Sequence, residues 1–156
     1  MIRRAVRNDV GAIHALLREL AVYERLEERF VVTPADLERD LFGERSFIEA
    51  LVAEGEGSTI GCAVYLPNYS TFAGHPTMWL EDVYVTPSAR GGGIGLDLVK
   101  AVARIGIERG WTPMMWACLD WNQPALDFYA RIGAIEDREW RRLILSTDAM
   151  HRLASS

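Results

Sequence analysis

Residues 80–98, LEDVYVTPSARGGGIGLDL, hold the pattern that decides the fold. An extended segment ending at Val85 is followed by a turn, three consecutive glycines and a helix that should run to about Arg109. Glycines remove the Cβ atoms that keep a ligand away from the backbone, and the start of a helix offers unpaired N–H groups and a positive dipole end. The stretch therefore predicts an anion-binding loop, with a purely structural turn as the alternative.

Two common phosphate-binding loops do not fit these residues. A nucleoside-triphosphate loop needs a lysine directly after its glycines, and Lys100 lies too far along the helix. A dinucleotide-binding loop needs a third glycine where this chain has Leu96 or Leu98. What remains is a pyrophosphate held mainly by backbone amides, with Arg90 nearby.

The glycine loop contains the motif Arg90-x-x-Gly93-x-Gly95, and a second motif follows downstream: Trp121-Asn122-Gln123-Pro124-Ala125 and then Phe128-Tyr129-x-x-x-Gly133-Ala134. Together the two motifs resemble the GNAT superfamily of acetyl-CoA-dependent acyltransferases. Further segments are similar to the spermidine/spermine N-acetyltransferase family: Leu20-Ala21-x-Tyr23-Glu24, Leu51-Val52-Ala53-Glu54, Leu80-Glu81-Asp82 and Trp121-Asn122-x-Pro124. The resemblance covers residues 2–145.

Composition indicates one ordinary globular domain over residues 1–156, with 49% hydrophobic and 25% charged residues. A net charge of −5 argues against nucleic acid as a partner and suits a cationic substrate. Three scattered histidines lack metal-ligand spacing, so we expect no metal, and Cys62 and Cys118 should be core residues. Without a signal peptide or membrane-spanning run in the pattern, we expect a cytoplasmic protein and no membrane partner.

The pattern of apolar residues and turn signals predicts an α/β fold. We expect strands at residues 2–6, 47–54, 59–66, 77–85, 113–119 and 139–145, a loop at 68–76, and helices after Asn8 or Asp9, after Thr33, from Gly93 or Ile94, after Asn122 and from Thr147 or Asp148. The helix between strands 77–85 and 113–119 should make them parallel. The resemblance implies the GNAT fold: a mixed central sheet of about six to seven strands, helices on both faces, and a V-shaped cleft between the two central parallel strands.

Two carboxylates interrupt the apolar strand 77–85. Strict alternation would place Trp79, Glu81 and Val83 on one face, and Leu80, Asp82 and Tyr84 on the other. A buried carboxylate is costly unless it is paired or used, so these acids indicate a site, with a solvent-facing acid at a strand end as the alternative.

The resemblance assigns roles to these and other residues. It implies that Glu81 binds the substrate ammonium and accepts its proton, and that Tyr129 is the acid that protonates the departing thiolate; a tyrosine that only fills an interface is the alternative. The implied amine-binding residues are Tyr23, Glu24, Glu81 and Asp82, while the glutamates near Glu24 otherwise read as a solvated helix end. The implied cofactor-binding residues are Val83, Tyr84, Val85, Arg90, Gly91, Gly92, Gly93, Ile94, Gly95, Leu96, Asn122, Pro124 and Ala125. Asn122 is otherwise a plain helix cap.

The chain is thus expected to be an acetyl-CoA-dependent N-acetyltransferase that moves an acetyl group to a primary amine of a small polyamine or a lysine-like amine such as thialysine. Transfer would occur by direct attack in a ternary complex, and the family implies a homodimer. Acetylation of peptide N-termini or antibiotics, and a catalytically silent acetyl-CoA-binding regulator, are the alternatives.

Overall fold

The computed structural model describes residues 1–155, and the chain divides into two compact units. The first unit is Met1–Ala117, and the second begins at Cys118. The first contains the sheet and the helices α1 (Val10–Tyr23), α2 (Pro34–Phe42) and α3 (Ile94–Arg109), while the second contains α4 (Gln123–Arg131) and α5 (Thr147–Ala154). The single domain expected from the sequence stays a prediction.

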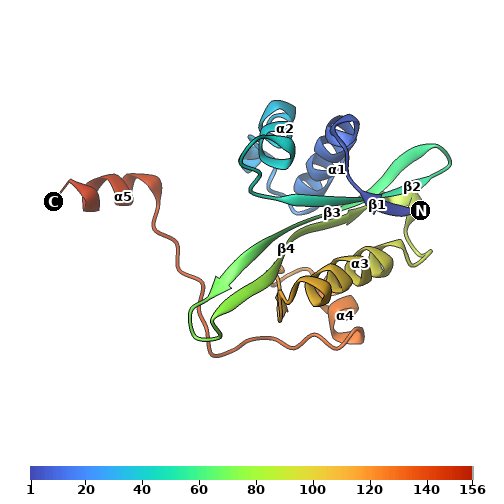
Figure 1. Cartoon of the computed structure of the whole chain (residues 1–156). Helices are drawn as coiled ribbons and strands as arrows, with labels where there is room; N and C mark the ends of the chain where they lie inside the picture. The colour runs from blue at the N-terminus through green and yellow to red at the C-terminus, as the bar shows by residue number, and fades with distance from the viewer. Residues whose placement is uncertain (156) are drawn as a thin grey trace. The chain divides into compact units, whose positions relative to one another are not determined.

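The first unit is built on a mixed sheet of five strands in the order β1-β2-β3-β4-β5 (Figure 1). The strands are β1 (Ile2–Arg4), β2 (Glu49–Gly55), β3 (Ser58–Ser70), β4 (His75–Val85) and β5 (Met114–Met115). The first four pair antiparallel, and β5 pairs parallel to β4. The α/β class and the parallel crossover are therefore confirmed.

The strand count differs from the expected six to seven. Within residues 1–155, the expected strand at 139–145 is absent. Of residues 113–119, only Met114 and Met115 pair with β4. Within the described chain, β4 residues after Trp79 therefore have no strand partner on that side. The expected loop at 68–76 is instead mostly hairpin, since β3 and β4 stay paired out to Ser70 and His75.

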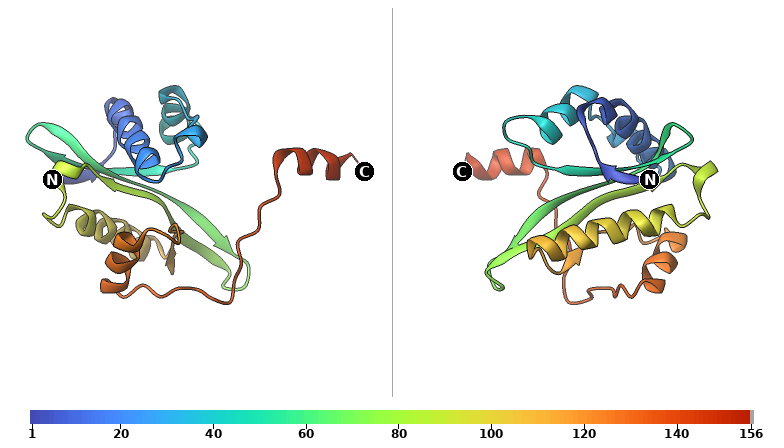
Figure 2. Two further views of the ribbon diagram at one scale, coloured as in Figure 1. Left: turned by 180° about the vertical axis from the view of Figure 1, so that it is seen from behind. Right: turned by 45° about the vertical axis from the view of Figure 1, so that its right-hand side comes forward.

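Helices cover both faces of the sheet, with α1 and α2 on one face and α3 on the other (Figures 1 and 2). The core under α1 and α2 joins buried residues of both helices to β2, β3 and β4: Val10, Ile13, Leu16, Leu17, Leu37, Leu41, Ala50, Val52, Cys62, Val64 and Tyr84. On the other face, Leu98 and Val102 of α3 are fully buried. These helices hold β4 between two apolar layers.

Local signals explain where the helices begin and end. Thr33 caps α2 as predicted: its hydroxyl accepts from the Asp36 amide at 3.2 Å, and Asp36 accepts from the Thr33 amide at 3.0 Å. Gly110, with φ 69°, ends α3. Asp9, one of the two residues predicted to cap α1, is its N-cap residue, but its side chain makes no capping hydrogen bond to the helix. A 3-10 turn (Arg7–Asp9) precedes the helix, and the Asp9 carboxylate accepts from the Val6 amide at 2.7 Å and pairs with Arg3.

Further short 3-10 turns lie at Glu27–Arg29 and Pro87–Ala89. Within residues 1–155, no helix is both long enough and apolar enough to cross a membrane.

A half-buried ion pair fastens the end of α3 to β2. Arg109 donates two hydrogen bonds to Glu49, and the Tyr65 hydroxyl donates a third to the same carboxylate at 3.3 Å. The Arg109 guanidinium also lies 4.5 Å from the centre of the Trp111 ring. The arginine beside Glu49 holds the pKa of that carboxyl below its usual value, while burial raises the pKa of Tyr65 to about 12.

Replacing Glu49 with Gln should lower the free energy of unfolding by about 1–3 kcal/mol, because Arg109 then keeps its half-buried charge without a counter-ion. Urea unfolding monitored by circular dichroism measures this. The matched control is Glu38→Gln, which breaks a more exposed pair with Arg7 and should cost less than about 0.5 kcal/mol. Equal effects of the two changes would contradict a special role for the Glu49 pair.

Candidate active site

The glycine loop leads from β4 into α3 with its backbone open to a ligand. Gly91 and Gly93 have φ values of 86° and 82°, which glycine adopts without strain. Neither would bring an added Cβ within 4 Å of another group, so the space beside the loop is open. Within residues 1–155, α3 has no side-chain cap at Gly93, and its first backbone hydrogen bond runs from the Asp97 amide to the Gly93 carbonyl. The amides of Ile94, Gly95 and Leu96 are therefore in the right place to bind an anion.

The backbone at the end of β4 alternates between β3 and the open side of the sheet. Thr86 donates its amide to the Ile60 carbonyl at 2.9 Å, and Cys62 lies opposite Tyr84. In an antiparallel ladder this places Tyr84 in a hydrogen-bonded pair with β3 and turns the polar groups of Val83 and Val85 toward the open side. Of the three residues predicted to bind the pantetheine arm, Val83 and Val85 thus have the required orientation, whereas the Tyr84 backbone is used within the sheet.

Arg90 connects the glycine loop to the end of α1. Its Nε donates to the Val85 carbonyl at 2.9 Å, and its guanidinium carbon lies 5.4 Å from the Tyr23 ring centre and 5.2 Å from that of Tyr84. Such distances allow cation–π attraction to both rings. The arginine predicted to add charge to the loop thus also holds Tyr23, a predicted amine-binding residue, beside it.

An extra residue in β4 changes which faces the two acids occupy. Val64 of β3 lies opposite Asp82, but the next residue, Tyr65, lies opposite Leu80, so Glu81 is a β-bulge. Directly opposed residues share a face, and Val64 belongs to the core under α1. Asp82 therefore points toward α1 and Leu80 toward α3. The predicted grouping of Leu80 with Asp82 and Tyr84 is wrong because the bulge interrupts the alternation.

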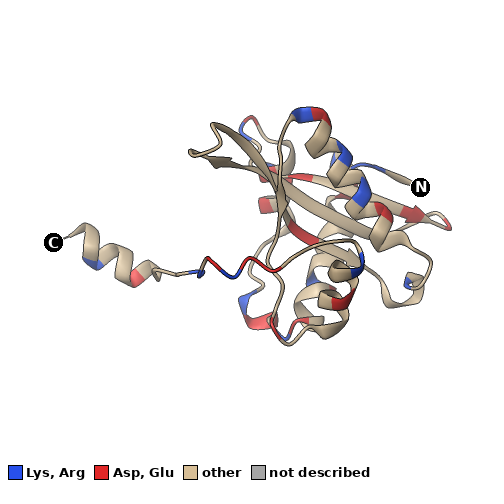
Figure 3. Cartoon of the chain, turned by 90° about the horizontal axis from the view of Figure 1, so that it is seen from below, with Lys and Arg blue, Asp and Glu red and all other residues tan. Residues whose placement is uncertain are grey.

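Asp82 is the most strongly perturbed carboxylate of the site. Burial, and then the neighbouring charges of Glu81 and Glu24, raise its pKa to about 7. Glu24 at the end of α1 also has a raised pKa, because it is partly buried. Acidic and basic residues are otherwise interspersed along the ribbon (Figure 3). We call Glu24, Glu81 and Asp82 the acidic cluster. A bound cation would offset the repulsion among these carboxylates and favour their charged forms.

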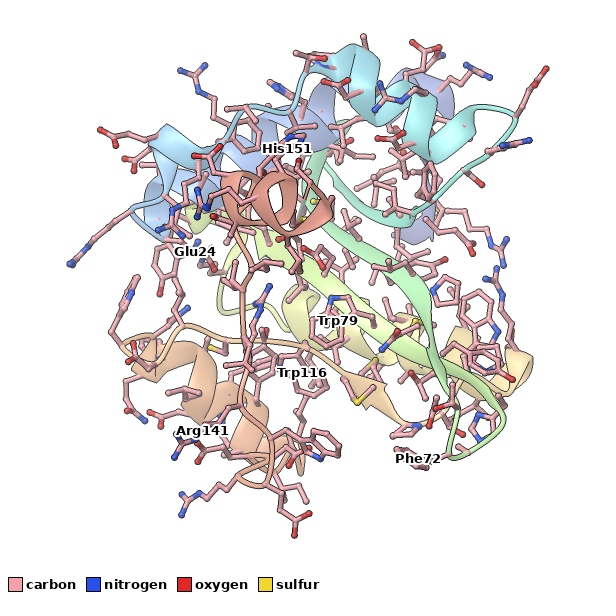
Figure 4. The ribbon with its side chains drawn as sticks, turned by 90° about the vertical axis from the view of Figure 1, so that its left-hand side faces the viewer. Glu24, Phe72, Trp79, Trp116, Arg141 and His151 are labelled. Carbon is pink, nitrogen blue, oxygen red and sulfur yellow. The ribbon has the colours of Figure 1, made fainter. Side chains whose placement is uncertain are left out.

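Trp79 also belongs to this site, although the sequence analysis assigned it no role. Its indole Nε1 donates to Oε2 of Glu81 at 2.6 Å. Figure 4 shows Trp79 and Trp116 near each other below Glu24, and Trp79 lies opposite Met115 in the β4–β5 pair. The expected placement of Trp79 and Glu81 on one face of the strand was the available signal for this contact.

The remaining predicted residues lie in the second unit, around α4. Asn122 is buried and caps the helix, its side-chain oxygen accepting from the Ala125 amide at 3.4 Å, and Pro124 lies in the first turn. Tyr129 follows Ala125 by four residues and so lies on the same side of the helix. Its half-buried ring packs edge-on against Phe128, with 5.3 Å between the ring centres. The capping role of Asn122 is confirmed, and its cofactor role stays a prediction.

Among residues 1–155, no three His, Cys, Asp or Glu side chains are grouped to hold a metal ion. Cys62 is buried, and burial raises the pKa of its thiol to about 12, which makes it a poor nucleophile at neutral pH.

Comparisons with known proteins agree on one family. Residues 12–134 match the family described as Acetyltransferase (GNAT) family. A thialysine N-epsilon-acetyltransferase of Bos taurus is 39% identical over 165 residues, covering 99% of this chain and 96% of that protein. An L-ornithine N5-acetyltransferase of Arabidopsis thaliana is 27% identical, covering 97% of this chain and 86% of that protein.

The solved structures agree in fold. An integron cassette protein from the mobile metagenome of V. cholerae superimposes with a TM-score of 0.83 at 27% sequence identity, covering 100% of this chain and 98% of that one. With the matches in sequence, this similarity shows that the chain has the GNAT fold and belongs to the GNAT family of acetyltransferases.

Proposed function

We propose that this chain transfers the acetyl group of acetyl-CoA to a primary amine of a small polyamine or a lysine-like amine. The observation that carries the proposal is the acidic cluster, which lies on the strand that leads into the glycine loop and includes an aspartate with a pKa raised to about 7. The relatives named for thialysine and ornithine acetylation support this substrate class, because both names describe amines of that kind.

The cofactor would bind along the open side of β4 and end at the loop. The polar groups of Val83 and the amide of Val85 would pair with the pantetheine arm as an added strand does, while the Val85 carbonyl already accepts from Arg90. The backbone of the loop and the first turn of α3, from Gly91 to Leu96, would hold the pyrophosphate. Asn122, Pro124 and Ala125 of the second motif would contact the arm. No step requires a metal.

The amine would bind as an ammonium ion at the acidic cluster, with Tyr23 beside it. An alkylamine with a pKa of about 10 is protonated at neutral pH and cannot attack until it loses a proton. Glu81 would accept that proton, directly or through water. The neutral nitrogen then attacks the thioester carbon, and the C–S bond breaks. Tyr129 donates its proton to the thiolate sulfur and recovers one from the acetylated nitrogen, so the net products are the amide, CoA and one proton.

We also propose that the chain forms a single GNAT domain and that the protein is a cytoplasmic homodimer. The family match at 12–134 crosses the boundary between the two units, which supports a single domain. Ile135, Leu143 and Ile144 are between 84% and 93% exposed, and large exposed apolar side chains commonly mark an interface. Light scattering of the purified full chain distinguishes a dimer from a monomer.

The decisive experiment is a thiol-release assay with acetyl-CoA and a panel of amines: putrescine, spermidine, spermine, lysine, thialysine, ornithine, a peptide N-terminus and an aminoglycoside. Turnover concentrated on small di- or polyamines or lysine-like amines supports the proposal. Turnover restricted to the peptide or the aminoglycoside contradicts the substrate class. Bound acetyl-CoA without turnover on any amine favours the silent regulator.

Replacing Tyr129 with Phe should lower kcat about 100-fold or more, because the thiolate then leaves without a positioned acid. Binding of acetyl-CoA should be unchanged when titrated by calorimetry. The matched control is Tyr69→Phe on the exposed end of β3, which should keep full turnover. An unchanged kcat in Tyr129→Phe would refute the acid role.

The pKa of Asp82 predicts a pH dependence for amine binding. Below about pH 7 this carboxyl is mostly protonated and attracts an ammonium ion weakly, and above it the carboxylate is charged. The KM for the amine should therefore fall several-fold between pH 6 and pH 8, while the amine itself stays protonated. Asp82→Asn should remove most of this fall, whereas Asp40→Asn on α2 should not. If the KM of Asp82→Asn still falls between pH 6 and pH 8, a group other than Asp82 causes the pH dependence.

Replacing Gly93 with Ala tests the loop. The substitution forces alanine into a positive φ at a cost of roughly 1 kcal/mol and adds a methyl group where the pyrophosphate would lie. The dissociation constant for acetyl-CoA should rise roughly tenfold. Gly74→Ala imposes the same strain at φ 76° in the β3–β4 turn and should lower stability similarly without affecting acetyl-CoA. Equal acetyl-CoA affinity in the two variants would argue against pyrophosphate binding by the glycine loop.

A further inference from the structure

Glu81 has little in its own backbone environment to orient its side chain. It is the extra residue of a β-bulge, so it has no partner directly opposite in β3, and its side chain is exposed. A glutamate in such a place samples many rotamers, and each ordered torsion costs entropy. A carboxylate that must accept a proton from one bound amine needs a better defined position than this backbone supplies.

Trp79 lies in the rigid part of the sheet and fixes the position of the Glu81 carboxylate. Its backbone lies where three strands are paired, opposite Leu66 of β3 and Met115 of β5. Its ring is half-buried, and its indole Nε1 reaches Oε2 of Glu81 at 2.6 Å. Within residues 1–155, no other side-chain hydrogen bond to the Glu81 carboxylate is formed. Trp79, whose backbone is fixed in the sheet, thus restrains the side chain of Glu81.

The chemistry of an indole suits this task. Its N–H only donates, so it can bind a carboxylate oxygen without competing for the proton of an amine. With Oε2 occupied, Oε1 remains the acceptor for an ammonium group. A hydrogen bond to a charged acceptor is stronger than one between neutral groups.

We infer that Trp79 is a positioning residue that orients Glu81 for proton acceptance through its indole N–H. The inference rests on the function proposed for Glu81 and adds a residue to that site. Trp79 needs no contact with the substrate for this role, and Glu24 and Asp82 still attract the cation when Trp79 is changed. Its loss should therefore reduce kcat more than amine binding.

The test is Trp79→Phe, which keeps an aromatic ring and removes the N–H. We expect kcat to fall about tenfold, with KM for the amine and for acetyl-CoA each within about twofold of the original value. The matched control is Trp111→Phe, at the other end of α3 under Arg109, which should leave kcat unchanged. Circular dichroism melting checks that all variants are folded.

A double-mutant cycle separates positioning from a general packing effect. In a Glu81→Ala background, Trp79→Phe should have almost no further effect on kcat, because the group it orients is gone. An undiminished tenfold effect there, or an unchanged kcat in the single variant, would overturn the inference. If Glu81→Ala itself keeps full kcat, the role proposed for Glu81 fails, so the two failures are distinguishable.

A second measurement does not depend on the folding of a Trp79 variant. The indole N–H signal of Trp79 in a 1H–15N spectrum should move upfield in Glu81→Ala, because its hydrogen bond is lost, while the Trp111 indole signal stays in place. An unmoved Trp79 signal would show that the hydrogen bond is not formed in solution and would also overturn the inference.

Discussion

The β-bulge at Glu81 is the constraint on which the site depends. Ahead of it, Met78 and Leu80 of β4 pack toward α3, and after it Asp82 and Tyr84 face α1. A regular strand would have buried Leu80 and Asp82 on the same side. The bulge instead lets one strand complete two apolar layers and still direct a carboxylate toward the end of α1, where Glu24 lies. Bulges commonly re-aim side chains near active sites, and the electrostatics here follow directly from this one.

The end of β4 combines three functions within a few residues. The backbone polar groups of Val83 and Val85 point to the open side, Asp82 faces the end of α1, and the loop after the strand leads into α3. Arg90 links these parts, since it bonds to Val85 and lies against Tyr23 and Tyr84. A change in the loop would therefore be transmitted to the predicted amine-binding residues by direct contact.

Much of the fold could be predicted because its signals are local. Thr33, Pro34 and Asp36 mark the start of α2, Gly110 marks the end of α3, and the crossover through α3 requires β5 to be parallel to β4. The errors arose where a distant partner decides the outcome. Residues 139–145 were expected to be a strand but form none in the described chain. The Asp9 carboxylate pairs with Arg3 rather than capping α1, and β3 and β4 pair through the expected loop at 68–76.

By itself, the sequence determined the α/β class, the glycine loop before α3, the family, and the presence of two adjacent acids in β4, because each depends on residue types at short spacing. The tertiary structure alone decided which face each acid occupies, how far the pKa of Asp82 rises, and which residue holds Glu81. These depend on the register between β3 and β4 and on burial under α1. Register and burial are set by contacts between segments far apart in the chain, which no local pattern specifies.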